Sequence, residues 1–78
     1  MNTSVVERVP LASAVECTPD ELTVTLVDGR RLSVPLAWFP RLAKASSSEL
    51  AHYELLGDGE GIHWPDIDED LSVEGLLR

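Results

Sequence analysis

The chain has 78 residues, enough for one small domain with a thin hydrophobic core. Its formal net charge of −8 argues against nucleic-acid binding, because that affinity comes largely from neutralising phosphates. Cys17 is the single cysteine, which excludes an internal disulfide and a cysteine-based zinc site. No stretch is apolar enough for a signal peptide or a membrane span, so we expect a cytoplasmic protein without membrane contact.

Residues 1–9 are expected to form a flexible N-terminus, and residues 10–78 a single domain. A weak alternation over residues 11–17 indicates a strand. The clearest local pattern follows in ELTVTLVDGRRLSVPL, where Leu22, Val24 and Leu26 alternate with polar residues and the run after the glycine alternates in the same way. The dipeptide Asp28-Gly29 between the two runs predicts a hairpin closed by a two-residue type I′ turn.

Residues 37–45 predict a short helix, provided that Pro40 falls in its first turn, where the missing N–H would have no partner anyway. Ser46 and Glu49 have the spacing of a capping box and predict a second helix. Residues 53–57 fit either the end of that helix or a strand. Residues 61–65 predict a strand, residues 66–72 a turn, and Ser72 caps a last short helix.

This order of elements predicts an α+β fold. We expect an antiparallel sheet of three to four strands, a meander that contains the Asp28-Gly29 hairpin. Two or three short helices are expected on one face of the sheet.

The spacing of Asp66, Asp68 and Asp70 matches the first three ligand positions of an EF-hand calcium loop. That loop also needs a glycine at position six and a glutamate at position twelve, where this chain has Leu71 and Leu77. The EF-hand interpretation therefore fails. A looser metal- or small-molecule-binding module that uses His63 and the acids of residues 66–70 stays open as the alternative, and no cofactor is expected.

If residues 61–65 alternate as a strand, His63 points away from Ile62 and Trp64 toward the less buried face. The nearby acids then favour an upward shift of its pKa. No serine lies in a nucleophile elbow, Cys17 has no basic neighbour in the sequence, and no phosphate-binding loop occurs. We therefore expect a protein that is not an enzyme.

Trp38 and Phe39 are adjacent and cannot both point inward from one helix, so one of them is predicted to be exposed. An exposed aromatic residue near Arg41 is typical of an interface hot spot. Seven acids lie between Asp58 and Glu74, where they can steer a basic protein partner. An unpaired edge strand would also permit a homodimer. The candidate partner-binding residues are Trp38, Arg41, His63, Asp66, Asp68, Glu69 and Asp70.

Three runs in the sequence, WFPRL (38–42), GIHWP (61–65) and DEDLS (68–72), follow one another in a specific order and spacing. In these runs the chain, from about residue 11 to 78, resembles the bacterial domain-of-unknown-function family number 2442. The resemblance implies a small α+β protein without assigned catalytic residues. It also implies a gene often found beside a second small family, number 4160, in a pair similar to a toxin–antitoxin module. By that analogy the chain is the antitoxin-like partner of a small, basic, toxin-like protein.

Overall fold

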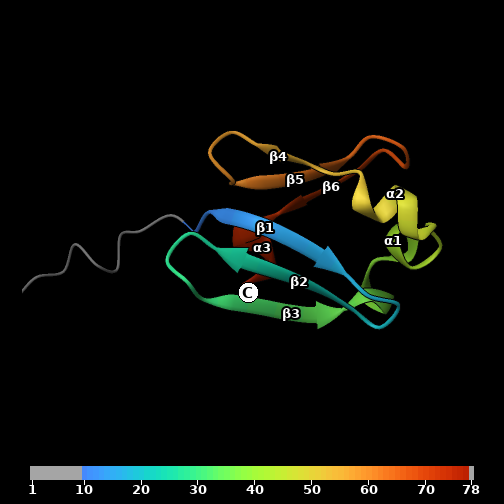
Figure 1. The fold of residues 1–78 in the computed structure, drawn as a ribbon, viewed down its shortest axis with the longest axis horizontal. Coiled ribbons are helices and arrows are strands. Elements are labelled where there is room, and N and C mark those ends of the chain that lie inside the picture. The colour runs from blue at the N-terminus through green and yellow to red at the C-terminus, as the bar shows by residue number, and fades with distance from the viewer. Residues whose placement is uncertain (1–9, 78) are drawn as a thin grey trace, which may run out of the picture.

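The computed structural model describes residues 10–77, so the flexible terminus predicted for residues 1–9 lies outside the described residues. Two three-stranded antiparallel sheets, in the orders β1-β2-β3 and β4-β5-β6, make up most of the fold (Figure 1). The strands are β1 (Ala12–Cys17), β2 (Glu21–Leu26), β3 (Arg31–Pro35), β4 (Glu54–Leu56), β5 (Gly61–Trp64) and β6 (Glu69–Ser72). The α+β class and the antiparallel pairing are confirmed, but the strands divide between two sheets instead of forming one.

The predicted hairpin is present, with β2 and β3 paired in register from Glu21 opposite Pro35 to Thr25 opposite Arg31. Its turn is not type I′, because that turn needs a positive φ at two residues and only Gly29, at φ 97°, has one here. The Gly29 N–H donates to the Leu26 carbonyl at 3.0 Å, and the Leu26 N–H donates to the Arg30 carbonyl at 2.8 Å. The loop is therefore a three-residue loop with glycine at its left-handed position.

Four short helical segments connect and follow the strands: the 3-10 helix η2 (Leu36–Trp38), α1 (Pro40–Ala43), α2 (Ser47–Ala51) and α3 (Val73–Leu76). The single helix predicted over residues 37–45 is interrupted at Phe39, which is extended at φ −124° and ψ 92°. The interruption follows from Pro40, which disfavours a helical residue before it and occupies the first position of α1. In Figure 1, α1 and α2 lie together at one end of the sheets.

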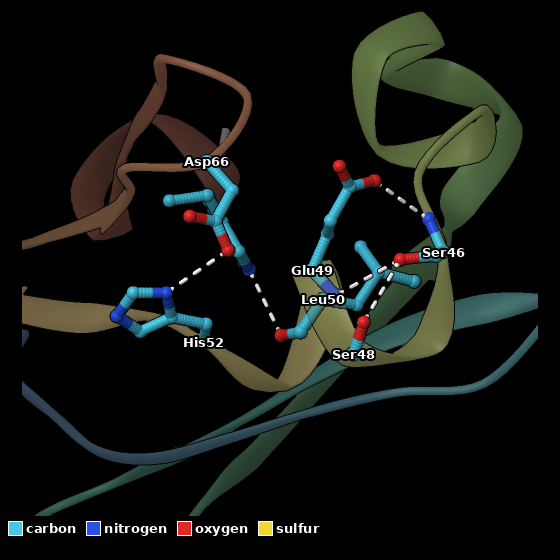
Figure 2. Close-up of polar contacts among 7 residues, drawn as sticks. Ser46, Ser48, Glu49, Leu50, His52 and Asp66 are labelled. Atoms are coloured by element: carbon cyan, nitrogen blue, oxygen red, sulfur yellow. Dashed lines mark hydrogen bonds and ion pairs between the residues drawn. The ribbon is translucent and has the colours of Figure 1, made fainter.

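The predicted caps of α2 and α3 are confirmed. The Ser46 side chain accepts from the Glu49 N–H at 3.1 Å while the Glu49 carboxylate accepts from the Ser46 N–H at 2.9 Å (Figure 2). The Ser72 hydroxyl accepts from the Gly75 N–H at 3.1 Å at the start of α3. Both helices thus begin where the sequence places their capping residues.

The second sheet settles one open alternative and corrects one prediction. Residues 54–56 form a strand, β4, which pairs with β5. The turn predicted for residues 66–72 is wrong over its second half, because Glu69–Ser72 is β6 and pairs along the whole of β5. Leu71 is the one apolar residue of β6, so the strand has no alternation of its own and forms through its pairing with β5.

A single hydrophobic core joins both sheets and the helices. Its fully buried large side chains are Trp64, Leu22, Leu42, Ile62, Val24 and Val73. The indole N–H of Trp64 donates to the Leu50 carbonyl at 3.1 Å, so the aromatic ring is buried without leaving its polar atom unpaired. Within residues 10–77, no helix is long and apolar enough to cross a membrane.

Candidate functional site

The three aspartates that suggested a calcium loop lie in separate local environments. The Asp66 carboxylate contacts Nδ1 of His52 at 2.9 Å, next to the C-terminal end of α2 (Figure 2). The Asp70 carboxylate contacts Nδ1 of His63 across the β5–β6 pair. Asp68 lies between them in a turn, with a left-handed φ of 52°. Over residues 10–77, no three His, Cys, Asp or Glu side chains lie close enough together to hold a metal ion, so the metal alternative gains no support.

His63 occupies the position predicted for it. It is half-buried, whereas its neighbours Ile62 and Trp64 on the opposite face are fully buried. The hydrogen bond to the Asp70 carboxylate raises the pKa of His63 above its ordinary value, and the charges of Asp70, Glu54 and Asp68 act in the same direction, against a smaller opposing effect of desolvation. The pair therefore favours the protonated imidazole in the folded protein.

Trp38 is the more exposed of the two adjacent aromatic residues. Its side chain is 68% exposed, while Phe39 is half-buried against the core. The 3-10 helix turns Leu36 into the core, and this places Trp38, two residues later, on the outside. The prediction that one member of the pair would be exposed is confirmed. A tryptophan this exposed leaves a large apolar surface in contact with water.

Trp38 stands at the edge of an apolar groove with a volume of about 310 Å³. The groove has β3, η2 and Phe39 on one side and β6 and α3 on the other. Its lining residues are Val34, Trp38, Phe39, Asp70, Leu71, Ser72, Gly75 and Leu76. This size is at the lower end of the range for small-molecule pockets, which is roughly 300–1,000 Å³. The groove is suited to a few apolar side chains next to one carboxylate.

The seven candidate partner-binding residues are only partly brought together. Trp38 and Asp70 line the same groove. Arg41 connects the segment that carries Trp38 to the segment that carries Asp70, because its Nη1 donates to the Asp68 carbonyl at 2.9 Å. His63 reaches this region through Asp70.

The remaining two candidates, Asp66 and Glu69, have other partners. Asp66 is held by His52, and Glu69 is half-buried opposite Trp64 in the β5–β6 register. The residues that sequence reasoning missed are the apolar lining residues Leu71, Gly75 and Leu76, which come together because β6 returns α3 to the core.

Two of the arginines, Arg30 and Arg41, have acceptors within the protein. Arg30 donates its Nε–H to the Asp28 carboxylate at 2.8 Å, and Arg41 donates to Asp68 as described above. Both interactions are exposed and therefore weak, but they hold the two guanidinium groups against acidic residues of the same chain. Cys17 is half-buried, and burial raises the pKa of its thiol, which keeps the sulfur in its unreactive protonated form.

Comparison with known proteins identifies a family. The family described as "Protein of unknown function (DUF2442)" matches residues 12–78. A crystal structure of a protein of unknown function from Rhodospirillum rubrum is similar to this chain, with a TM-score of 0.75 and 32% sequence identity over 90% of this chain and 87% of that one. Comparison with curated proteins gave no match. Since the match spans most of the sequence, the chain belongs to the DUF2442 family.

Proposed function

We propose that this member of the DUF2442 family is a non-enzymatic protein that binds and masks a small, basic protein partner in the cytoplasm, in the manner of an antitoxin. The observation that carries the proposal is Trp38, which is 68% exposed beside an apolar groove. Tryptophan is among the residues most enriched at the energetic centres of protein interfaces. Burial of this side chain and the groove by a partner would remove the largest exposed aromatic surface among the described residues.

The charge of the protein supports a basic partner. Seven of the fourteen acids lie between Asp58 and Glu74, and no lysine or arginine occurs between residues 45 and 77. Asp70 brings this acidic segment to the groove itself, where its side chain is 67% exposed. Acidic side chains around an apolar centre accelerate encounter with a basic protein, and they disfavour acidic competitors.

The test is affinity purification from the host with the tagged protein, followed by identification of any stoichiometric partner and measurement of its dissociation constant. Trp38→Ala should weaken binding by about thirtyfold or more, as expected for loss of a hot-spot residue. Val27→Ala is the matched control, because Val27 is 61% exposed and lies on the β2–β3 loop, outside the groove lining. That variant should bind within about twofold of the wild type.

Two results would contradict the proposal. One is the absence of any stoichiometric protein partner at modest salt concentration. The other is equal binding by the Trp38 and Val27 variants when circular dichroism shows both to be folded. The antitoxin-like role has its own readout: expression of the isolated partner should arrest growth, co-expression of the wild type should restore it, and co-expression of Trp38→Ala should not.

A further inference from the structure

β6 is an edge strand whose outer side faces the groove region. The Val73 N–H donates to the Glu60 carbonyl at 3.0 Å, and the same register pairs Leu71 with Ile62 and Glu69 with Trp64. In an antiparallel pair, residues alternate between those that bond to the partner strand and those whose backbone groups point away from it. The backbone N–H and C=O of Asp70, and the N–H of Ser72, therefore point away from β5.

These outward groups lie on a short open section of strand. On one side, Arg41 covers the Asp68 carbonyl through its hydrogen bond. On the other side, α3 begins at Val73. Among the described residues, neither Asp70 nor Ser72 contributes a backbone group to the hydrogen bonds that link different elements. The open section thus offers the N–H and C=O of Asp70 and the N–H of Ser72.

The β1 edge of the first sheet is partly covered. In β1, the Val15 N–H donates to the Tyr53 hydroxyl at 3.2 Å, and the Ala12 N–H donates to the Gly59 carbonyl at 2.8 Å. β3 ends in Pro35, which has no N–H to offer. Proteins commonly use such devices to prevent unwanted strand pairing. By the same alternation, Arg31 and Ser33 of β3 also direct backbone groups away from the sheet. What distinguishes β6 is the groove, to which it contributes three consecutive lining residues, whereas β3 contributes only Val34.

The groove lies directly along this section. Asp70, Leu71 and Ser72 are consecutive, and all three line it. The facing wall is apolar and includes Trp38 and Phe39. An extended chain placed along β6 would pair with Asp70 and insert alternate side chains between the walls.

We propose that the groove binds an extended segment of the partner, which adds as a fourth strand to the edge of β6. The segment alternates apolar residues with lysine or arginine. Its apolar residues fill the groove beside Trp38, and a basic residue pairs with the Asp70 carboxylate. This inference rests on the proposed function and deepens it by assigning the mode of binding.

Charge selects a partner segment over a second copy of this chain. A β6–β6 pair would bring the exposed Asp70 carboxylates of two molecules close together, and like charges placed opposite one another destabilise a strand pair. Each copy would also carry a net charge of −8. A basic segment avoids both penalties and gains charge pairing in their place.

Selection from a phage-displayed library of random short peptides, with Trp38→Ala as the counter-selection target, provides the first test. The enriched peptides should alternate apolar and basic residues with a period of two. When the best peptide is synthesised and added to the full chain, amide hydrogen exchange should slow at Asp70 and Ser72. N-methylation of every second peptide amide should abolish binding when the methylated amides are the ones that face β6. Methylation of the other set should leave binding intact. Enrichment at helical spacing, or unchanged exchange at both amides, overturns the inference.

The second test removes one backbone donor from the strand. Asp70→Pro eliminates the outward N–H, and an edge position of this kind tolerates proline without loss of a sheet hydrogen bond. Asp70→Ala is the matched control, because it loses the same carboxylate and the same contact with His63 but keeps the N–H. The proline variant should bind the peptide between about twofold and tenfold more weakly than the alanine variant, as expected for one hydrogen bond. Equal affinities of two folded variants overturn the inference.

Failure of this inference is distinguishable from failure of the proposed function. If the partner isolated from the host depends on Trp38 while the library yields no peptide that depends on Trp38, the partner binds with a folded surface and strand addition is wrong. If neither a partner nor a peptide depends on Trp38, both proposals fail together.

Discussion

Replacement of Gly59 by alanine should push the two sheets apart. The Gly59 carbonyl accepts the Ala12 N–H at 2.8 Å, and this bond ties β1 of the first sheet to the β4–β5 turn of the second. A Cβ on Gly59 would lie 2.3 Å from the Ala12 carbonyl oxygen and 2.9 Å from its nitrogen. Both atoms belong to the backbone of β1, so the overlap is relieved only if the sheets move apart.

The cost has two parts. A positive φ, here 109°, costs alanine about 1–2 kcal/mol relative to glycine. Loss of the inter-sheet hydrogen bond adds about 1 kcal/mol. The sum, about 2–3 kcal/mol before any steric term, is a large part of the free energy of unfolding expected for 78 residues, about 4–12 kcal/mol. The melting temperature should fall by roughly 4–8 °C for each kcal/mol.

Gly29 provides the control for this experiment. Its φ of 97° is similarly unfavourable for alanine, but a Cβ there would meet nothing within 4 Å. In urea denaturation, Gly29→Ala should lower the free energy of unfolding only by the cost of the positive φ, about 1–2 kcal/mol. Gly59→Ala should lower the free energy of unfolding by at least about 1 kcal/mol more than Gly29→Ala does. If the two variants lose the same free energy of unfolding, the close approach of β1 to the turn does not stabilise the fold, and the reasoning is wrong.

Three further predictions concern the second sheet and the helix that covers it. Trp64→Phe should lower the free energy of unfolding by about 2 kcal/mol or more, because it removes the partner of a part-buried backbone carbonyl of α2 and shrinks a fully buried side chain; urea denaturation measures this. Ser46→Ala should cost about 0.5–2 kcal/mol through loss of the capping box. Ser48→Ala removes only the contact of its hydroxyl with the Ser46 hydroxyl and should cost less in the same assay. Because the folded pKa of His63 is raised, its contribution to stability is fully present below the unfolded pKa of about 6.5 and is lost as pH rises through the folded value. Asp70→Asn should lower that pKa in an NMR titration, and an unchanged value would contradict the assigned cause.

The accuracy of the sequence predictions follows the range of the interactions that form each element. The β2–β3 hairpin is local, with apolar residues in alternation on both strands, and it was predicted to within a residue or two. The caps at Ser46 and Ser72 were found because each capping side chain bonds to the backbone N–H only three residues later. β6 was missed because it carries one apolar residue, Leu71, and takes its conformation from β5. The division into two sheets was missed for a similar reason, since contacts such as that between Ala12 and Gly59 leave no periodic pattern.

The same contrast between local and long-range interactions applies to the candidate site. The exposure of one residue of the Trp38-Phe39 pair could be predicted, because two adjacent aromatic residues cannot both enter the core from one short helix; the structure shows that it is Trp38. The groove beside it could not be predicted, because Leu71 and Leu76 reach Trp38 only after β6 has paired and α3 has turned back. A sequence pattern can thus identify an anchor residue, but the surface around that residue depends on which distant strand passes next to it.

The same strand explains why the carboxylates of the acidic segment lie apart in the structure. As part of a continuous turn, Asp66, Asp68 and Asp70 could have converged on one ion. The strand begins at Glu69, so Asp70 belongs to the β5–β6 pair and contacts His63, while Asp66 stays in the turn and contacts His52. Pairing with β5 therefore disperses the carboxylates and, at the same time, turns the backbone of Asp70 outward along the groove. The separation of the carboxylates and the outward backbone of Asp70 are two consequences of one register.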